Sequence, residues 1–156
     1  MFLKIEFDTL VEESRLLIDT VKRSVISAND KNVVVKVEPS GVVSFLALTD
    51  IVVAKTSVTT SAVEVTDFEG EEPIYFQIPA LTLEKLLSTY SANELTTPLN
   101  VTFHPLTDTE VAITVQESLK LPDKEEEIRN SSLRSKTPPF YISDLYRLEY
   151  ISIAED

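Results

Sequence analysis

The first half of the chain combines strand-like and helix-like patterns of apolar positions. Residues 2–7 alternate apolar and polar side chains, which predicts a first strand. Residues 33–65 are rich in valine, threonine, isoleucine and phenylalanine, the composition of a pleated, half-buried surface. We expect a hairpin here across the Pro-Ser-Gly turn at residues 39–41, where Gly41 can supply a positive φ, and then a β-rich run that is broken near Thr59.

A helical period replaces the alternation over residues 10–25. Its apolar stripe consists of Leu10, Leu17, Ile18, Val21 and Val25. Charged residues project from the other side, as in an amphipathic surface helix. Thr9 followed by Glu12 has the spacing of a capping box, and we expect Asp8 or Thr9 to cap the start of the helix.

A second helix is predicted directly after the strand at residues 73–78. Four apolar residues fall at i, i+3, i+4 and i+7, and they are Leu83, Leu86, Leu87 and Tyr90. Pro79 marks the change from strand to helix, because proline is tolerated in the first turn of a helix and not beyond it.

The rest of the chain predicts more strands around a charged segment. Residues 99–103 and 110–116 have the pattern of another hairpin. Residues 121–139 are dominated by charged residues, serine and proline, which predicts an exposed loop. Residues 140–156 regain apolar character, and the alternation over 147–153 favours a closing strand over a terminal helix. The order of elements indicates an α+β fold with mainly antiparallel pairing.

Composition excludes several classes of protein. A chain of 156 residues with 43% hydrophobic and 26% charged residues is typical of a globular domain. It has no apolar run near the ~18 residues that a membrane-spanning helix needs, and its acidic N-terminal segment is unlike a signal peptide. Without cysteine there is no disulfide and no thiolate ligand, so we expect a cytoplasmic protein. The net charge of −12 disfavours non-specific adhesion to nucleic acid but permits a local basic patch.

The sequence lacks the residue patterns that common catalytic and cofactor sites need. His104 is the only histidine, so a catalytic triad or a histidine-ligated metal site cannot be assembled. Two glycines leave no glycine-rich phosphate loop. The acidic residues 69–72 and 123–127 lack the alternating ligand spacing of a calcium loop. We expect no enzyme, no cofactor and no metal.

Four segments, in this order, resemble one domain of the DNA sliding clamps, the ring-shaped polymerase processivity factors. The first strand runs directly into an amphipathic helix, and the hairpin VVVKVEPSGVVSFLALTDIVVAK contains a Thr-Asp turn like that of bacterial β clamps. The segment IYFQIPALTLEKLLSTYSAN resembles the clamp strand that ends in a small-residue and proline turn before the second helix. The paired strands LNVTFHP and EVAITVQES follow it, so the likeness covers roughly residues 2–117.

The resemblance implies curved sheets with two helices on one face, where the helices line a central hole around duplex DNA. Lysine and arginine on such helices face phosphates without reading bases, so that a ring holds DNA topologically and slides. The residues in the matching positions are Arg15, Lys22, Arg23 and Lys85. The resemblance further implies a DNA polymerase and a clamp loader as partners, self-association into a ring, and a bacterial cell or a virus-infected host cell as the location.

A plainer interpretation of the same cations remains open. In this interpretation the four cations are ordinary solvated residues, and Arg15 is expected to form an ion pair with Asp19 one helical turn away. The groove that clamps use for their partners is not located by the sequence; Phe140 and Tyr141 are candidates for it, although core packing explains them as well.

The chain also departs from the clamp pattern. Clamp subunits carry two or three such domains, whereas this chain has room for one. We divide it into a core at residues 1–120, the charged loop at 121–139, and residues 140–156, which either close the same domain or open a truncated second one. The alternative function is a protein-interaction module, such as a viral structural or adaptor protein, that does not bind DNA.

Overall fold

The computed structural model describes residues 1–24, 31–48, 53–91, 95–120 and 122–136. This part of the chain contains two α-helices, a short 3-10 helix and two antiparallel sheets. The helices are α1 (Phe7–Arg23) and α2 (Ala80–Ser91), and the 3-10 turn is η2 (Thr60–Ala62). The strands are β1 (Phe2–Glu6), β2 (Asn32–Val37), β3 (Val43–Leu48), β4 (Val53–Ser57), β5 (Val63–Thr66), β6 (Ile74–Pro79), β7 (Thr96–Thr107), β8 (Glu110–Leu119) and β9 (Glu127–Lys136).

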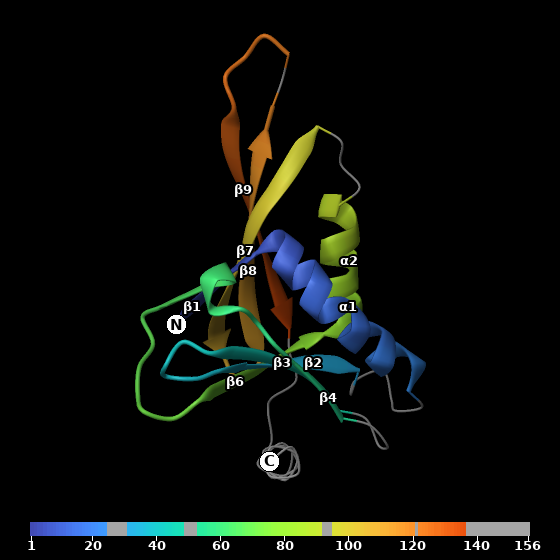
Figure 1. Cartoon of the computed structure of the whole chain (residues 1–156), viewed down its shortest axis with the longest axis vertical. Coiled ribbons are helices and arrows are strands. Elements are labelled where there is room, and N and C mark those ends of the chain that lie inside the picture. Colours follow the sequence, from blue (N-terminus) through green and yellow to red (C-terminus); the bar gives the residue numbers. More distant parts are fainter. Residues whose placement is uncertain (25–30, 49–52, 92–94, 121, 137–156) are drawn as a thin grey trace.

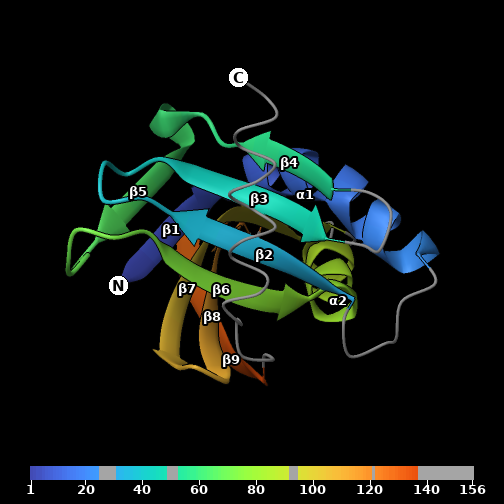
Figure 2. The ribbon, with the colours of Figure 1, turned by 90° about the horizontal axis from the view of Figure 1, so that it is seen from below.

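The predicted α+β class with antiparallel sheets is confirmed. Sheet A has the strand order β5-β1-β7-β8-β9, and sheet B has the order β4-β3-β2-β6. Figure 1 shows both helices running side by side against the sheets, while the β8–β9 hairpin projects beyond them. Figure 2 shows sheet B from its other side, with the helices behind it.

The topology contains the same unit twice. The order β-α-β-β-β describes both β1-α1-β2-β3-β4 and β6-α2-β7-β8-β9, with β5 inserted between the two units. The first strand of each unit pairs in the sheet of the other unit, β1 beside β7 and β6 beside β2. This exchange of strands interlocks the two units into one body.

The first helix begins earlier than its sequence predicts. It starts at Phe7, and Glu6 precedes it without a side-chain hydrogen bond to the first turn. The capping box of Thr9 and Glu12 is therefore wrong, because β1 passes straight into α1 and Thr9 already lies inside the first turn. Phe7, expected on the strand, is 3% exposed and anchors that turn in the core.

The second helix follows its prediction closely. β6 ends at Pro79 and α2 begins at Ala80. The Ala80 backbone N–H donates to the Lys31 carbonyl at 2.9 Å, which satisfies one of the donors that a helix start leaves free. Leu83, Leu86 and Leu87 are buried as the period predicts.

The largest difference from the sequence prediction lies in the charged segment. The exposed loop predicted over residues 121–139 is wrong for Glu127–Lys136, which form β9 antiparallel to β8. Nearly all of β9 is exposed, because it is an edge strand and needs no apolar alternation. The closing strand expected within 140–156 lies outside the described residues.

The predicted hairpin of residues 99–116 is confirmed and is longer than expected. β7 contains Pro98 and Pro105, which lack the N–H that a central strand needs. The β7–β8 register shifts beside each proline, and β1 pairs only with the part of β7 between them. Both prolines therefore lie outside the part of β7 that is paired along both edges.

One apolar core, in which β9 takes no part, joins both helices to the two sheets. It holds Leu10 and Leu17 of α1, Leu83 of α2, Phe45 of sheet B and Phe103 of sheet A, each at most 1% exposed. Burial of the apolar surface of these side chains is the main favourable contribution to the free energy of folding, at about 25 cal/mol per Å². None of the helices in the described part of the chain is long and apolar enough to span a membrane.

Two adjacent leucines of α1 test how far the core depends on this helix. Leu17 is fully buried and Leu16 is 64% exposed. We expect Leu17→Ala to lower the free energy of unfolding by about 2–5 kcal/mol, because it leaves a cavity. Leu16→Ala, the matched control, should change it by less than about 0.5 kcal/mol. Equal effects in urea unfolding would show that α1 does not pack as described.

Candidate functional site

The two helices form an antiparallel pair whose outer side is open. Lys22, in the last turn of α1, meets Glu84, in the first turns of α2. Further along, an open groove of about 260 Å³ lies between the helices. Its lining residues are Val11, Arg15, Ile18, Asp19, Glu84, Leu87, Ser88 and Ser91. The groove thus has an apolar floor and charged rims.

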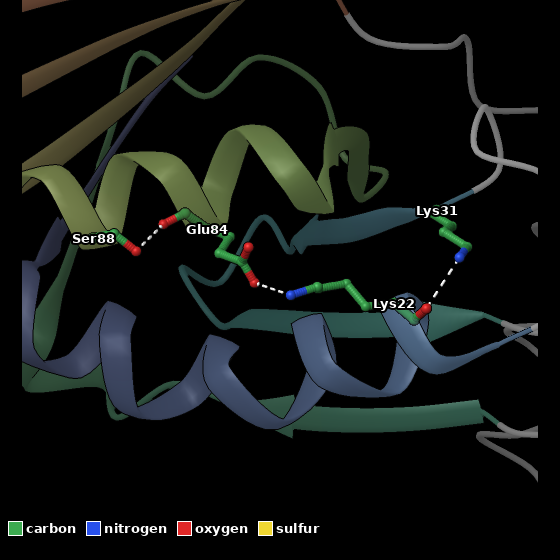
Figure 3. Close-up of polar contacts among 4 residues, drawn as sticks. All are labelled: Lys22, Lys31, Glu84 and Ser88. Atoms are coloured by element: carbon green, nitrogen blue, oxygen red, sulfur yellow. Dashed lines mark hydrogen bonds and ion pairs between the residues drawn. The ribbon is translucent and has the colours of Figure 1, made fainter.

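A short polar network fastens the helices to each other (Figure 3). The Lys22 ammonium donates to Glu84 Oε2 at 2.5 Å. The Lys31 ammonium donates to the Lys22 carbonyl at 3.0 Å, where a helix C-terminus favours a cation. Ser88 Oγ donates to the Glu84 carbonyl at 2.9 Å. Lys22 is therefore held at the seam between the helices.

All four cations predicted to face DNA lie exposed on the helix pair. Arg15, Lys22, Arg23 and Lys85 are the residues concerned. Lys22 forms an ion pair with Glu84. In contrast, Arg15, Arg23 and Lys85 make no ion pair with any described residue. The plain alternative, an ion pair between Arg15 and Asp19, is not among the ion pairs of the described residues. Three of the four cations are thus available to an external anion.

The helix pair carries little of the acidity of the chain. Its basic residues are the four predicted cations, and its acidic residues are Asp8, Glu12, Glu13, Asp19 and Glu84. The net charge of the pair is therefore −1, although the whole chain has −12. The helix pair is thus far less acidic than the chain as a whole, which lowers its repulsion of a polyanion.

A second hollow lies on sheet A beside η2. It has a volume of about 560 Å³, and Lys4, Glu6, Asp8 and Glu64 stand among its lining residues. These carboxylates do not gather into a metal site; no group of three or more histidine, aspartate or glutamate side chains does so in the described parts of the chain.

His104 has a structural environment. Its ring stacks on Phe2, with centroids 4.0 Å apart and the planes 9° from parallel. Nδ1 lies 2.8 Å from the Met1 carbonyl oxygen, which can only accept, so Nδ1 carries the proton. His104 thus ties the start of the chain to β7.

The helix cations were predicted from the sequence, but Glu84 was not predicted as the partner of Lys22. Glu84 lies 62 positions from Lys22, and no local signal connects them. Arg129, Arg134 and Lys136 on β9 were also missed as strand residues; Arg134 pairs with Glu110 at 3.2 Å. Phe140 and Tyr141, the candidates for a partner groove, lie outside the described residues.

Comparison with known proteins assigns no family. A scan against protein-family models and a search of curated proteins gave no match to this chain.

The Lys22–Glu84 contact can be measured by a double-mutant cycle with Lys22→Ala and Glu84→Ala. Its coupling free energy should be about 0.2–1 kcal/mol, because both side chains are partly exposed, at 46% and 34%. The coupling should shrink as salt is added. The Arg134–Glu110 pair within sheet A provides the control for a contact that joins no helices. A coupling that salt does not change would contradict an exposed ion pair.

Proposed function

We propose that this chain is a DNA sliding clamp, or one domain of a clamp, that encircles duplex DNA and tethers a polymerase as its processivity factor. The single observation that carries the proposal is the antiparallel helix pair with exposed Arg15, Arg23 and Lys85, which form no ion pair with any residue of the described ranges. The protein acts in this proposal without catalysis and without a cofactor. Its location is the cytoplasm of a bacterial cell or of a virus-infected host cell.

The topology supports this proposal. The resemblance implies two helices on one face of curved sheets, and α1 and α2 lie side by side in this chain (Figure 1). The two β-α-β-β-β units place one helix each in equivalent positions. Such a surface presents cations of both helices, Arg15, Lys22 and Arg23 on α1 and Lys85 on α2.

The charge distribution supports it as well. Loose phosphate contacts give affinity that does not depend on sequence. Asp19 and Glu84 stand beside Arg15 in the groove and weaken the positive field there. A nearly neutral helix surface favours weak, mobile contact over tight binding.

A clamp also needs a ring and partners. In the proposal, copies of this chain associate into a closed ring, and a DNA polymerase and a clamp loader bind its outer surface. The rival function, a protein-interaction module without DNA binding, is favoured by one observation: β9 is a long edge strand, and in the described structure β8 is the strand that pairs with it. Such an edge is suited to pairing with another chain.

Charge reversal separates the two functions. The triple variant Arg15→Glu, Arg23→Glu, Lys85→Glu should lose most binding to duplex DNA at low salt, measured by fluorescence anisotropy. Each phosphate contact that is lost should also reduce the slope of log K against log salt by about 0.9. In primer extension on circular DNA with polymerase and loader, the same variant should give shorter products.

A matched control reverses three exposed cations elsewhere, with Lys4→Glu, Lys124→Glu and Arg129→Glu. It changes the net charge equally and leaves the helices intact, so it should bind DNA nearly as the native chain does. Equal losses in both variants would mean that only overall charge matters. No DNA binding by the native chain at any concentration that forms oligomers would favour the interaction module.

A further inference from the structure

The two ends of the helix pair carry opposite charge. At one end, residues 7–14 of α1 include three acidic residues and no basic one, and residues 86–91 of α2 are uncharged. The three acidic residues are Asp8, Glu12 and Glu13. At the other end basic residues outnumber acidic ones. They are Arg15, Lys22, Arg23 and Lys85, with Asp19 and Glu84 as the acids. The small net charge of the pair is therefore the sum of an acidic end and a basic end.

The dipoles of the helices do not cause this difference. Lys22 near the end of α1 meets Glu84 near the start of α2, so the two helices run antiparallel. The negative end of one helix dipole thus lies beside the positive end of the other, and the two largely offset each other. The difference in charge between the ends comes from the side chains.

Lys31 adds a fifth cation to the basic end, although it belongs to neither helix. It directly precedes β2. Its carbonyl oxygen accepts the Ala80 N–H at the start of α2 at 2.9 Å. Its ammonium donates to the Lys22 carbonyl in the last turn of α1 at 3.0 Å, as Figure 3 shows. Lys31 therefore joins the end of α1 to the start of α2.

The Lys31 ammonium keeps donors for an external anion. A lysine ammonium has three N–H donors, and the Lys22 carbonyl accepts one of them. This contact is exposed, and Lys31 forms no ion pair with any residue of the described ranges. Since the carbonyl is a neutral acceptor, the charge of Lys31 is not balanced by the bond that fixes its position.

We propose that Lys31 binds a phosphate of the DNA backbone, and that the duplex contacts the helix pair at its basic end, which we define as Lys22, Arg23, Lys31 and Lys85. This inference rests on the proposed function and locates its contact. Lys22 is engaged by Glu84, whereas the other three cations form no ion pair with a described residue. The three carboxylates of the opposite end repel phosphate. The duplex therefore meets the pair at this end and not along its whole length.

Lysine footprinting tests the contact in the native chain. Amine acetylation, measured by mass spectrometry with and without a short DNA duplex, reports which ammonium groups the duplex covers. Lys31 and Lys85 should become protected when DNA is bound. Lys4 on β1 and Lys124 before β9 are exposed and provide the controls, because they should react equally in both samples.

Substitutions of Lys31 separate phosphate binding from capping of α1. Lys31→Gln keeps a donor for the Lys22 carbonyl and removes the charge, so the slope of log K against log salt should fall by about 0.9. Lys31→Arg keeps the charge and should retain the native slope. Lys4→Gln, which changes the net charge equally, should retain it as well. Urea unfolding of each variant reports whether the fold itself has changed.

Three results would overturn this inference and leave the proposed function in place, because the native chain binds DNA in each. The first is equal reactivity of Lys31 with and without bound duplex. The second is a native salt slope in Lys31→Gln, which would leave Lys31 as a cap of α1 only. The third is an equal loss of slope in Lys31→Gln and Lys4→Gln, which would mean that only overall charge matters. No binding of duplex by the native chain would overturn the inference together with the proposed function.

Discussion

Two helices must bury their leucine stripes against two sheets at the same time, and the rest of the structure depends on this constraint. Leu17 of α1 and Leu83 of α2 share one cluster with Phe45 of sheet B and Phe103 of sheet A. Because β1 and β6 each pair in the sheet of the other unit, neither sheet can move away without breaking strand pairs. The same packing leaves the opposite side of both helices free, and that free side carries Arg15 and Lys85.

Buried periodic elements were predictable from the sequence, and exposed or interrupted ones were not. Ile18 and Val21 were predicted to face the core from the helical spacing of the apolar residues, and both are buried in α1. Thr9 and Glu12 matched a capping box, but the core position of Phe7 moved the helix start ahead of them. Tertiary packing overrode a local signal there.

The edge of sheet A shows a second limit of sequence patterns. β9 has the charged, serine-rich composition of a loop, since neither of its faces enters the core. β9 pairs with β8 through backbone hydrogen bonds, which do not require alternating apolar side chains. The sequence of β9 therefore shows no apolar period. The candidate site was predictable in the same uneven way: exposed cations on a helix follow from its period, whereas the Lys22–Glu84 contact follows only from how the helices pack.

If the chain is a whole clamp subunit and not one domain of a clamp, its copies must close into a ring, and the mass in solution tests this most directly. Light scattering on a sizing column, over a wide range of protein concentrations, distinguishes a closed ring from other states. A ring of this chain has one discrete mass, a whole multiple of 17.5 kDa, since closed symmetry fixes the number of copies. A 17.5 kDa monomer at every concentration, or an assembly that grows without limit, would contradict it.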